Sequence, residues 1–186
     1  MSKFGKRLTQ EEFVGGLFHA LMVVYDQTVK TRGEKHADEW LILHDVILSL
    51  AFLAAGLEAG EQDKRLRDVL DGFHGKVAAG MLQAGIPAGV VTGYEQKRTE
   101  RFREYNPLIR RAGGSFASDT EMELGRVIAN HVGEPEHPMR AYAEFRATFR
   151  TTKEGLGRIF SRHAGFERTV RGFLRQTAHW FRRGGH

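Results

Sequence analysis

The sequence predicts an all-α fold, a single-domain bundle of six to seven helices within residues 1–186. Apolar side chains recur at three- and four-residue intervals along most of the chain, which is the spacing of one helix face. No long apolar–polar alternation supports a β-sheet, and no repeat of about 20 to 50 residues indicates a solenoid. With 41% hydrophobic and 27% charged residues, the 186-residue chain can bury one continuous core.

The first three helices are expected at residues 10–31, from 34 or 38 to about 60, and 61–85. Thr9 and Glu12 have the spacing of a capping box at the start of the first helix. Gly33 separates the first two helices, and a glycine-containing polar turn separates the second from the third. Gly85 is expected to end the third helix.

The remaining helices are expected at residues 87–105, from 119 or 120 to 131, 140–162, and from 166 toward the carboxyl terminus. Asn106 precedes Pro107 and is biased away from helical geometry, which predicts a bend or stop there. Residues 112–118 are predicted to form a loop. Gly155 and Gly157 mark a point where the sixth helix could be interrupted.

The most apolar stretch, residues 40–57, barely reaches membrane-spanning length and contains His44, Asp45 and Ser49. On a helical projection one narrow polar stripe interrupts an otherwise apolar surface; it consists of Asp38, Asp45, Ser49 and Gly56. Because an ionisable group in the bilayer costs several kcal/mol, we interpret this stretch as the central helix of a soluble bundle in preference to a membrane span. Residues 1–13 contain no apolar run of signal-peptide length.

The net charge of +5 is unevenly distributed. Residues 1–139 carry 17 basic and 20 acidic side chains, net −3, whereas residues 140–186 carry 11 basic and 3 acidic ones, net +8. A one-sign surface of this kind is typical of contact with phosphate, anionic lipid or an acidic protein. The chain has no cysteine, which excludes disulfides, thiolate metal sites and cysteine nucleophiles.

In the last predicted helix aromatic and aliphatic side chains lie opposite basic ones. The candidate partner-binding residues of this carboxyl-terminal basic surface are Arg168, Arg171, Arg175, Trp180, Phe181, Arg182 and Arg183. Three interpretations stay open: a solvated helix face packed on the bundle, a surface that meets anionic lipid or an anionic protein, and a nucleic-acid-binding surface.

The adjacent His44 and Asp45 resemble the His-Asp pair of metal-dependent phosphohydrolases, but the further histidine and carboxylate that such a site needs are not evident. His19 falls on the polar side of the first helix. His44 lies on the apolar side of the second, where a buried neutral histidine with a satisfied hydrogen bond is the better interpretation. A metal-dependent hydrolase centred on this pair remains the third functional hypothesis.

The order of several short motifs resembles the ubiquinol–cytochrome c chaperone family, over about residues 40–149. These motifs are Trp-Leu-Ile-Leu-His at 40–44, Met-Leu-x-x-Gly-Ile at 81–86, Arg-Phe-Arg-Glu-Tyr at 101–105 and Glu-Leu-Gly-Arg-Val-Ile-Ala-Asn at 123–130. The family's acidic Asp-Met-Asp stretch and its Phe-Tyr-Gly-Arg string are absent, so no functional residue is transferred. The resemblance implies a helical, non-catalytic assembly factor that binds a membrane-protein client at the bilayer surface.

The sequence thus favours a protein that works by binding, as an assembly chaperone or adaptor, over an enzyme. No catalytic residue and no cofactor is predicted, because nucleotide-binding glycine loops and nucleophile elbows are missing. The expected location is cytoplasmic, peripheral at a membrane.

Overall fold

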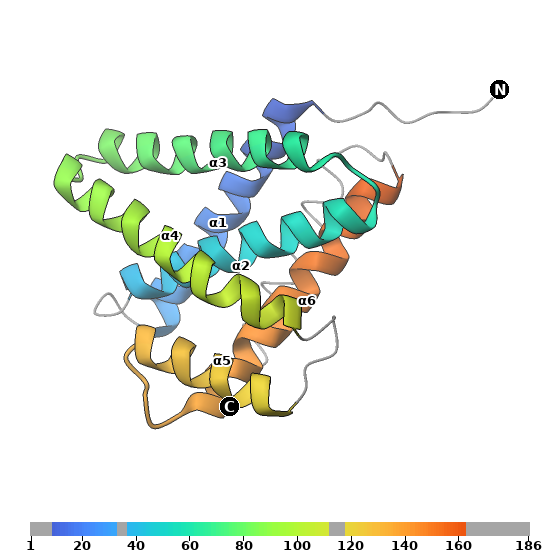
Figure 1. Ribbon diagram of the computed structural model, residues 1–186. Helices are drawn as coiled ribbons and strands as arrows, with labels where there is room; N and C mark the ends of the chain where they lie inside the picture. Colours follow the sequence, from blue (N-terminus) through green and yellow to red (C-terminus); the bar gives the residue numbers. More distant parts are fainter. Residues whose placement is uncertain (1–8, 33–36, 112–117, 163–186) are drawn as a thin grey trace.

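The computed structural model describes residues 9–32, 37–111 and 118–162, and it confirms the all-α prediction (Figure 1). This part of the chain contains six helices and no strand. They are α1 (Gln10–Arg32), α2 (Ala37–Glu58), α3 (Asp63–Gln83), α4 (Ala88–Arg111), α5 (Ser118–His131) and α6 (Pro138–Arg162). The predicted seventh helix and residues 112–117 of the predicted loop lie outside the described residues.

The helices begin and end at capping residues that can be recognised in the sequence. At the start of α1 the Thr9 hydroxyl accepts from the Glu12 amide at 3.2 Å, and the Glu12 carboxylate accepts from the Thr9 amide at 2.7 Å, so the capping box is confirmed. Three helices end at glycines with positive φ, namely Gly60, Gly85 and Gly133. In each case the glycine amide and the next amide donate back to carbonyls of the last turn, which is the Schellman motif.

At two places where the sequence indicated an interruption, the helix does not stop. Helix α4 does not stop at Asn106 but continues through Pro107 to Arg111. Pro107 is exposed, and only four residues of α4 follow it. The backbone hydrogen bond that proline cannot donate is therefore lost near the helix end, at the solvated rim of the bundle. Helix α6 runs unbroken through Gly155 and Gly157 because it packs along α2 over much of its length.

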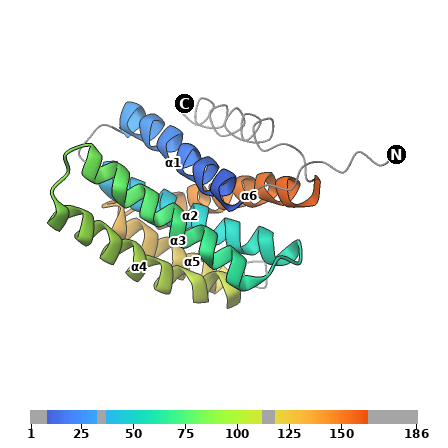
Figure 2. The same cartoon turned by 90° about the horizontal axis from the view of Figure 1, so that it is seen from above.

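Helix α2 is the centre of the bundle. It packs against α1, α3, α4 and α6, and every residue from Trp40 to Phe52 is buried. Figure 2 shows α2 between α1 and α6 on one side and α3 and α4 on the other. By length and a mean hydropathy of 2.0 it could also cross a membrane, but 83% of that stretch is buried inside the protein, as expected for a central core helix.

An aromatic cluster closes the core between α1, α2 and α6. The Phe13 ring lies 5.8 Å from Phe52 and 5.2 Å from Phe160, measured between ring centroids. On the opposite side of α2, helices α3 and α4 diverge from the turn that joins them, and α2 crosses behind their open end (Figure 1). Residues of these three helices line an open space, where the candidate site lies.

Candidate functional site

A buried polar cluster joins α2, α3 and α4 at the floor of that space. The Asp45 carboxylate, which is fully buried, accepts a hydrogen bond from the Tyr94 hydroxyl at 2.7 Å and one from the Ser49 hydroxyl at 3.3 Å. The His74 imidazole approaches through Nε2, 3.0 Å from Ser49 Oγ and 3.4 Å from Asp45 Oδ1. Burial, followed by the Asp45 charge, raises the pKa of Tyr94 well above its ordinary value, so Tyr94 stays a hydrogen-bond donor.

The cluster contains a serine, a histidine and an aspartate, but its geometry is not that of a nucleophilic triad. In a triad one imidazole nitrogen accepts from the serine while the other donates to the aspartate. Here the single hydroxyl proton of Ser49 goes to Asp45, and Nε2 of His74 faces both groups. A ring protonated on Nε2 satisfies both contacts, and in that form it cannot deprotonate Ser49.

A cleft of about 590 Å³ opens above this cluster. Its apolar lining comes from all three helices and consists of Leu53, Leu57, Leu70 and Phe102. Its polar lining includes Ser49 and His74 at one end and three arginines, Arg67, Arg98 and Arg103. A cleft of this size, with an apolar surface and a few converging polar groups, is typical of a ligand-binding site.

The neighbouring His44 and Asp45 lie toward different parts of the bundle. His44 is buried on the side of α1 and α6, and its Nδ1 donates to the Trp40 carbonyl oxygen at 2.7 Å, as expected for a buried histidine with a satisfied hydrogen bond. Asp45 faces α3 and α4 instead. His19 is exposed on α1, and the described residues hold no group of three or more histidines and carboxylates placed to bind a metal. The geometry thus gives no metal site with both residues as ligands.

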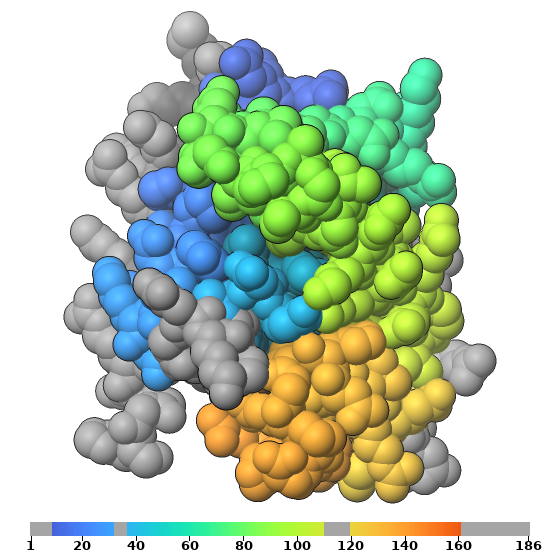
Figure 3. Space-filling model, turned by 90° about the vertical axis from the view of Figure 1, so that its left-hand side faces the viewer, coloured from blue at the N-terminus to red at the C-terminus, as the bar shows by residue number. Residues whose placement is uncertain are grey.

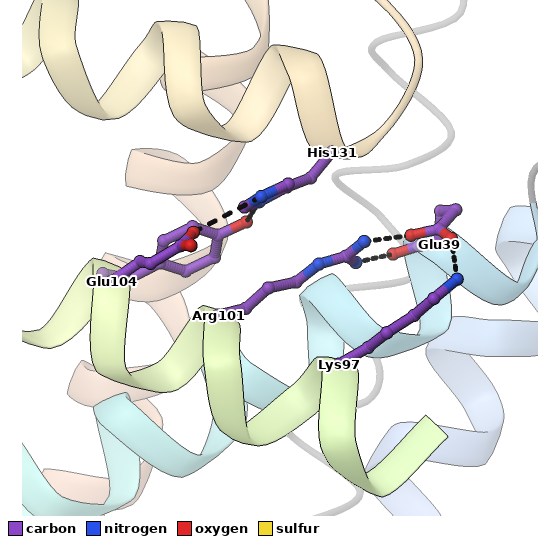
Figure 4. A network of polar contacts seen from close by, with 6 residues as sticks. Glu39, Lys97, Arg101, Glu104 and His131 are labelled. Carbon is purple, nitrogen blue, oxygen red and sulfur yellow. Dashed lines mark hydrogen bonds and ion pairs between the residues drawn. The ribbon is translucent and has the colours of Figure 1, made fainter. Parts of the chain in front are cut away.

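A second polar network ties α4 to the start of α2 and to the end of α5 (Figure 4). The Arg101 guanidinium is buried and pairs with the Glu39 carboxylate, which also accepts from Lys97 Nζ at 2.9 Å. Burial by itself would raise the pKa of Glu39, but the hydrogen bonds from Lys97 and Arg101 outweigh it, and the net shift lowers that pKa. The carboxylate is already shared by two cations, so this network serves mainly to fasten the helices.

Further along α4, the Tyr105 hydroxyl lies 2.7 Å from His131 Nδ1, and His131 Nε2 lies 3.3 Å from Glu104. Burial, followed by the Arg101 charge, lowers the pKa of His131. A neutral ring satisfies both contacts: Nδ1 accepts from Tyr105 and Nε2 donates to Glu104.

The predicted partner-binding residues Arg168, Arg171, Arg175, Trp180, Phe181, Arg182 and Arg183 all lie outside the described residues. Conversely, the sequence did not single out the cleft. One signal was present, because the stripe of Asp45 and Ser49 on an apolar helix requires buried partners. Nothing in the sequence named His74 and Tyr94 as those partners.

The fold places this chain among all-α helical bundles with a cleft over a central helix. Compared with protein-family models, curated proteins and solved structures, the chain shows no match. The resemblance to the ubiquinol–cytochrome c chaperones therefore stays a prediction.

Proposed function

We propose that this protein works by binding a segment of another protein, as an assembly chaperone or adaptor. The observation that carries the proposal is the cleft above α2, which combines an apolar lining with arginines and is open between α3 and α4. The only serine–histidine–aspartate group beside it, within the described residues, is arranged for mutual hydrogen bonding. A binding role uses the cleft as it is, whereas hydrolysis would need a different placement of His74.

The sequence supplies two further arguments for this role. The order of motifs over residues 40–149 resembles a family of assembly factors that bind membrane-protein clients. The net charge of +8 over residues 140–186 also suits an anionic protein partner or an anionic membrane surface, so the protein would act in the cytoplasm, peripheral to a membrane.

Site-specific photo-crosslinking in cells tests whether the cleft receives a client. A photoreactive amino acid replaces Leu57 at the cleft or, as a control, Met139 on α6; both side chains are 47% exposed, and only Leu57 lines the cleft. We expect Leu57 to crosslink to one defined segment of a client, and a synthetic copy of that segment to bind the purified protein saturably. If both positions crosslink to the same proteins, or the copy does not bind, the cleft is not a client site.

A separate experiment addresses the carboxyl-terminal arginines. Replacing Arg168, Arg171 and Arg175 together by Gln should weaken co-sedimentation with vesicles that contain anionic lipid and leave neutral vesicles unaffected. Steep, salt-dependent binding to DNA or RNA without any lipid binding would instead favour a nucleic-acid partner.

A further inference from the structure

Arg98 is the unusual residue of the cleft. Its Nη1 atom is buried and has no hydrogen-bond partner among the described residues, although Arg98 lines the cleft. A buried charged donor without an acceptor loses its hydration and gains no hydrogen bond in exchange, which is unfavourable. Because Arg98 also lines the cleft, a ligand there is placed to offer its guanidinium the acceptor that the described residues do not supply.

The charges around Arg98 indicate what kind of acceptor fits. Arg67 is already paired with Asp63 on the same helix at 2.8 Å. The Asp45 carboxylate at the floor is already engaged by Tyr94, Ser49 and His74. The remaining charged side chains of the lining are Arg98, Arg103 and Asp71, which together carry one net positive charge. A single negative charge would balance them, and a carboxylate offers the planar pair of oxygens that a guanidinium binds best.

The neighbours of Arg98 are apolar as well as polar. Phe102 follows one helical turn later on α4, and Leu53 and Leu70 lie across the cleft on α2 and α3. A ligand that reaches Arg98 therefore has its carboxylate next to a group that fills an apolar space.

We infer that Arg98 binds a carboxylate of the ligand in this cleft and that an adjoining apolar group of the same ligand packs against Leu53, Leu70 and Phe102. Only the source of the carboxylate rests on the proposed function: if the ligand is a client segment, the carboxylate belongs to an acidic side chain or to the chain terminus. The recognition chemistry itself is independent of the client's identity.

The test compares 4-phenylbutyrate with 4-phenylbutyramide, two small probes that share the aromatic end and differ in charge. In ¹⁵N-correlated NMR spectra we expect the acid to shift the amide signals of Ser49, Thr99 and Phe102 saturably and to bind at least about tenfold more tightly than the amide. Arg98→Gln should remove this preference, and Arg98→Lys should retain part of it. Arg126→Gln, on the exposed face of α5 outside the cleft, should leave the preference unchanged.

Equal affinity for acid and amide in the unaltered protein, or no shift with either probe up to its solubility limit, overturns the inference without requiring a variant to fold. A preference that persists in a folded Arg98→Gln protein overturns it as well. If Leu57 crosslinks to a client but probe binding does not depend on Arg98, the carboxylate site is refuted and the client-binding function stands. If the probes bind as expected but Leu57 crosslinks to no client, the client-binding function is refuted and the carboxylate site stands. Once a client segment is known, amidating its terminus and replacing its acidic residues separately identifies the source of the carboxylate.

Discussion

Gly125 allows α5 and α6 to approach more closely than a side chain would permit. A Cβ atom at this position would lie 2.5 Å from the Pro138 carbonyl oxygen, which belongs to the backbone and cannot rotate away. Gly75 on α3 offers a matched contrast, because a Cβ there would meet nothing within 4 Å.

Gly125→Ala should therefore destabilise the protein by about 1–3 kcal/mol, as overpacking of a tight contact does. Gly75→Ala should stabilise it by about 0.5–1 kcal/mol, since alanine loses less conformational entropy in a helix. Urea unfolding of both variants checks the prediction. An unchanged or higher midpoint for Gly125→Ala would show that the helix contact at Gly125 does not resist a methyl group, and a lower midpoint for Gly75→Ala would contradict the entropic gain expected there.

His131 makes the stability of the bundle depend on pH. Its folded-state pKa is lowered, first by burial and then by the Arg101 charge, from the ordinary value of 6.5. The unfolded chain consequently takes up a proton on His131 before the folded chain does, so the stability that this residue contributes is present above pH 6.5 and is lost as the pH falls below it.

The free energy of unfolding of the unaltered protein should therefore decrease more than that of His131→Gln when the pH is lowered from about 7.5 to about 5.5. The variant keeps the carboxylates that also titrate at low pH. The difference between the two proteins in the pH dependence of the free energy of unfolding is therefore due to the histidine. Parallel profiles would mean that His131 is equally basic in both states.

At the scale of the helices, Pro107 lies inside α4 four residues before its end. Proline supplies no amide for the hydrogen bond to the carbonyl of residue 103, and its ring crowds that carbonyl. Pro87 is different, because it immediately precedes α4 and its own carbonyl accepts from the Val90 and Val91 amides.

Pro107→Ala should raise the thermal midpoint, with a gain of about 1 kcal/mol or more, because a full helical hydrogen bond replaces the missing one. Pro87→Ala should be neutral or slightly destabilising, since proline suits the start of a helix. Scanning calorimetry of the two variants distinguishes these outcomes. A lower midpoint for Pro107→Ala would indicate that the last turn of α4 depends on the proline ring.

Sequence patterns predict the ends of the helices better than the angles between them. Glycines and the Thr9 capping box define most helix ends by local chemistry, and these ends were predicted to within a few residues. The exception is at Pro107. Asn106, as the residue before a proline, is only weakly biased away from helical geometry, and the burial of Tyr105 and Leu108 in the core outweighs that bias. The cleft could not be predicted, since it depends on the angle between α3 and α4 and not on the periodicity of either helix.

At the scale of the whole molecule, the turn that joins α3 and α4 is an uncharged part of the surface. The joining turn projects at the side of the molecule seen in Figure 3 (green), and residues 77–94 around it contain no charged side chain. Leu82 and Val90 are 50% and 55% exposed there, and of residues 82–90 all but Ile86 are exposed, so the turn itself is not packed into the core.

The central position of α2 has a consequence for the hydrogen-exchange behaviour of the chain. Amide protons between Trp40 and Phe52 can reach solvent only when the helices on both sides of α2 separate, so they should exchange with deuterium at the rate set by global unfolding. Amides near Leu82 should exchange earlier, by local opening of the turn. Mass spectrometry of deuterated peptides would then resolve two tiers of protection, with the slow tier reporting the stability of the bundle as a unit.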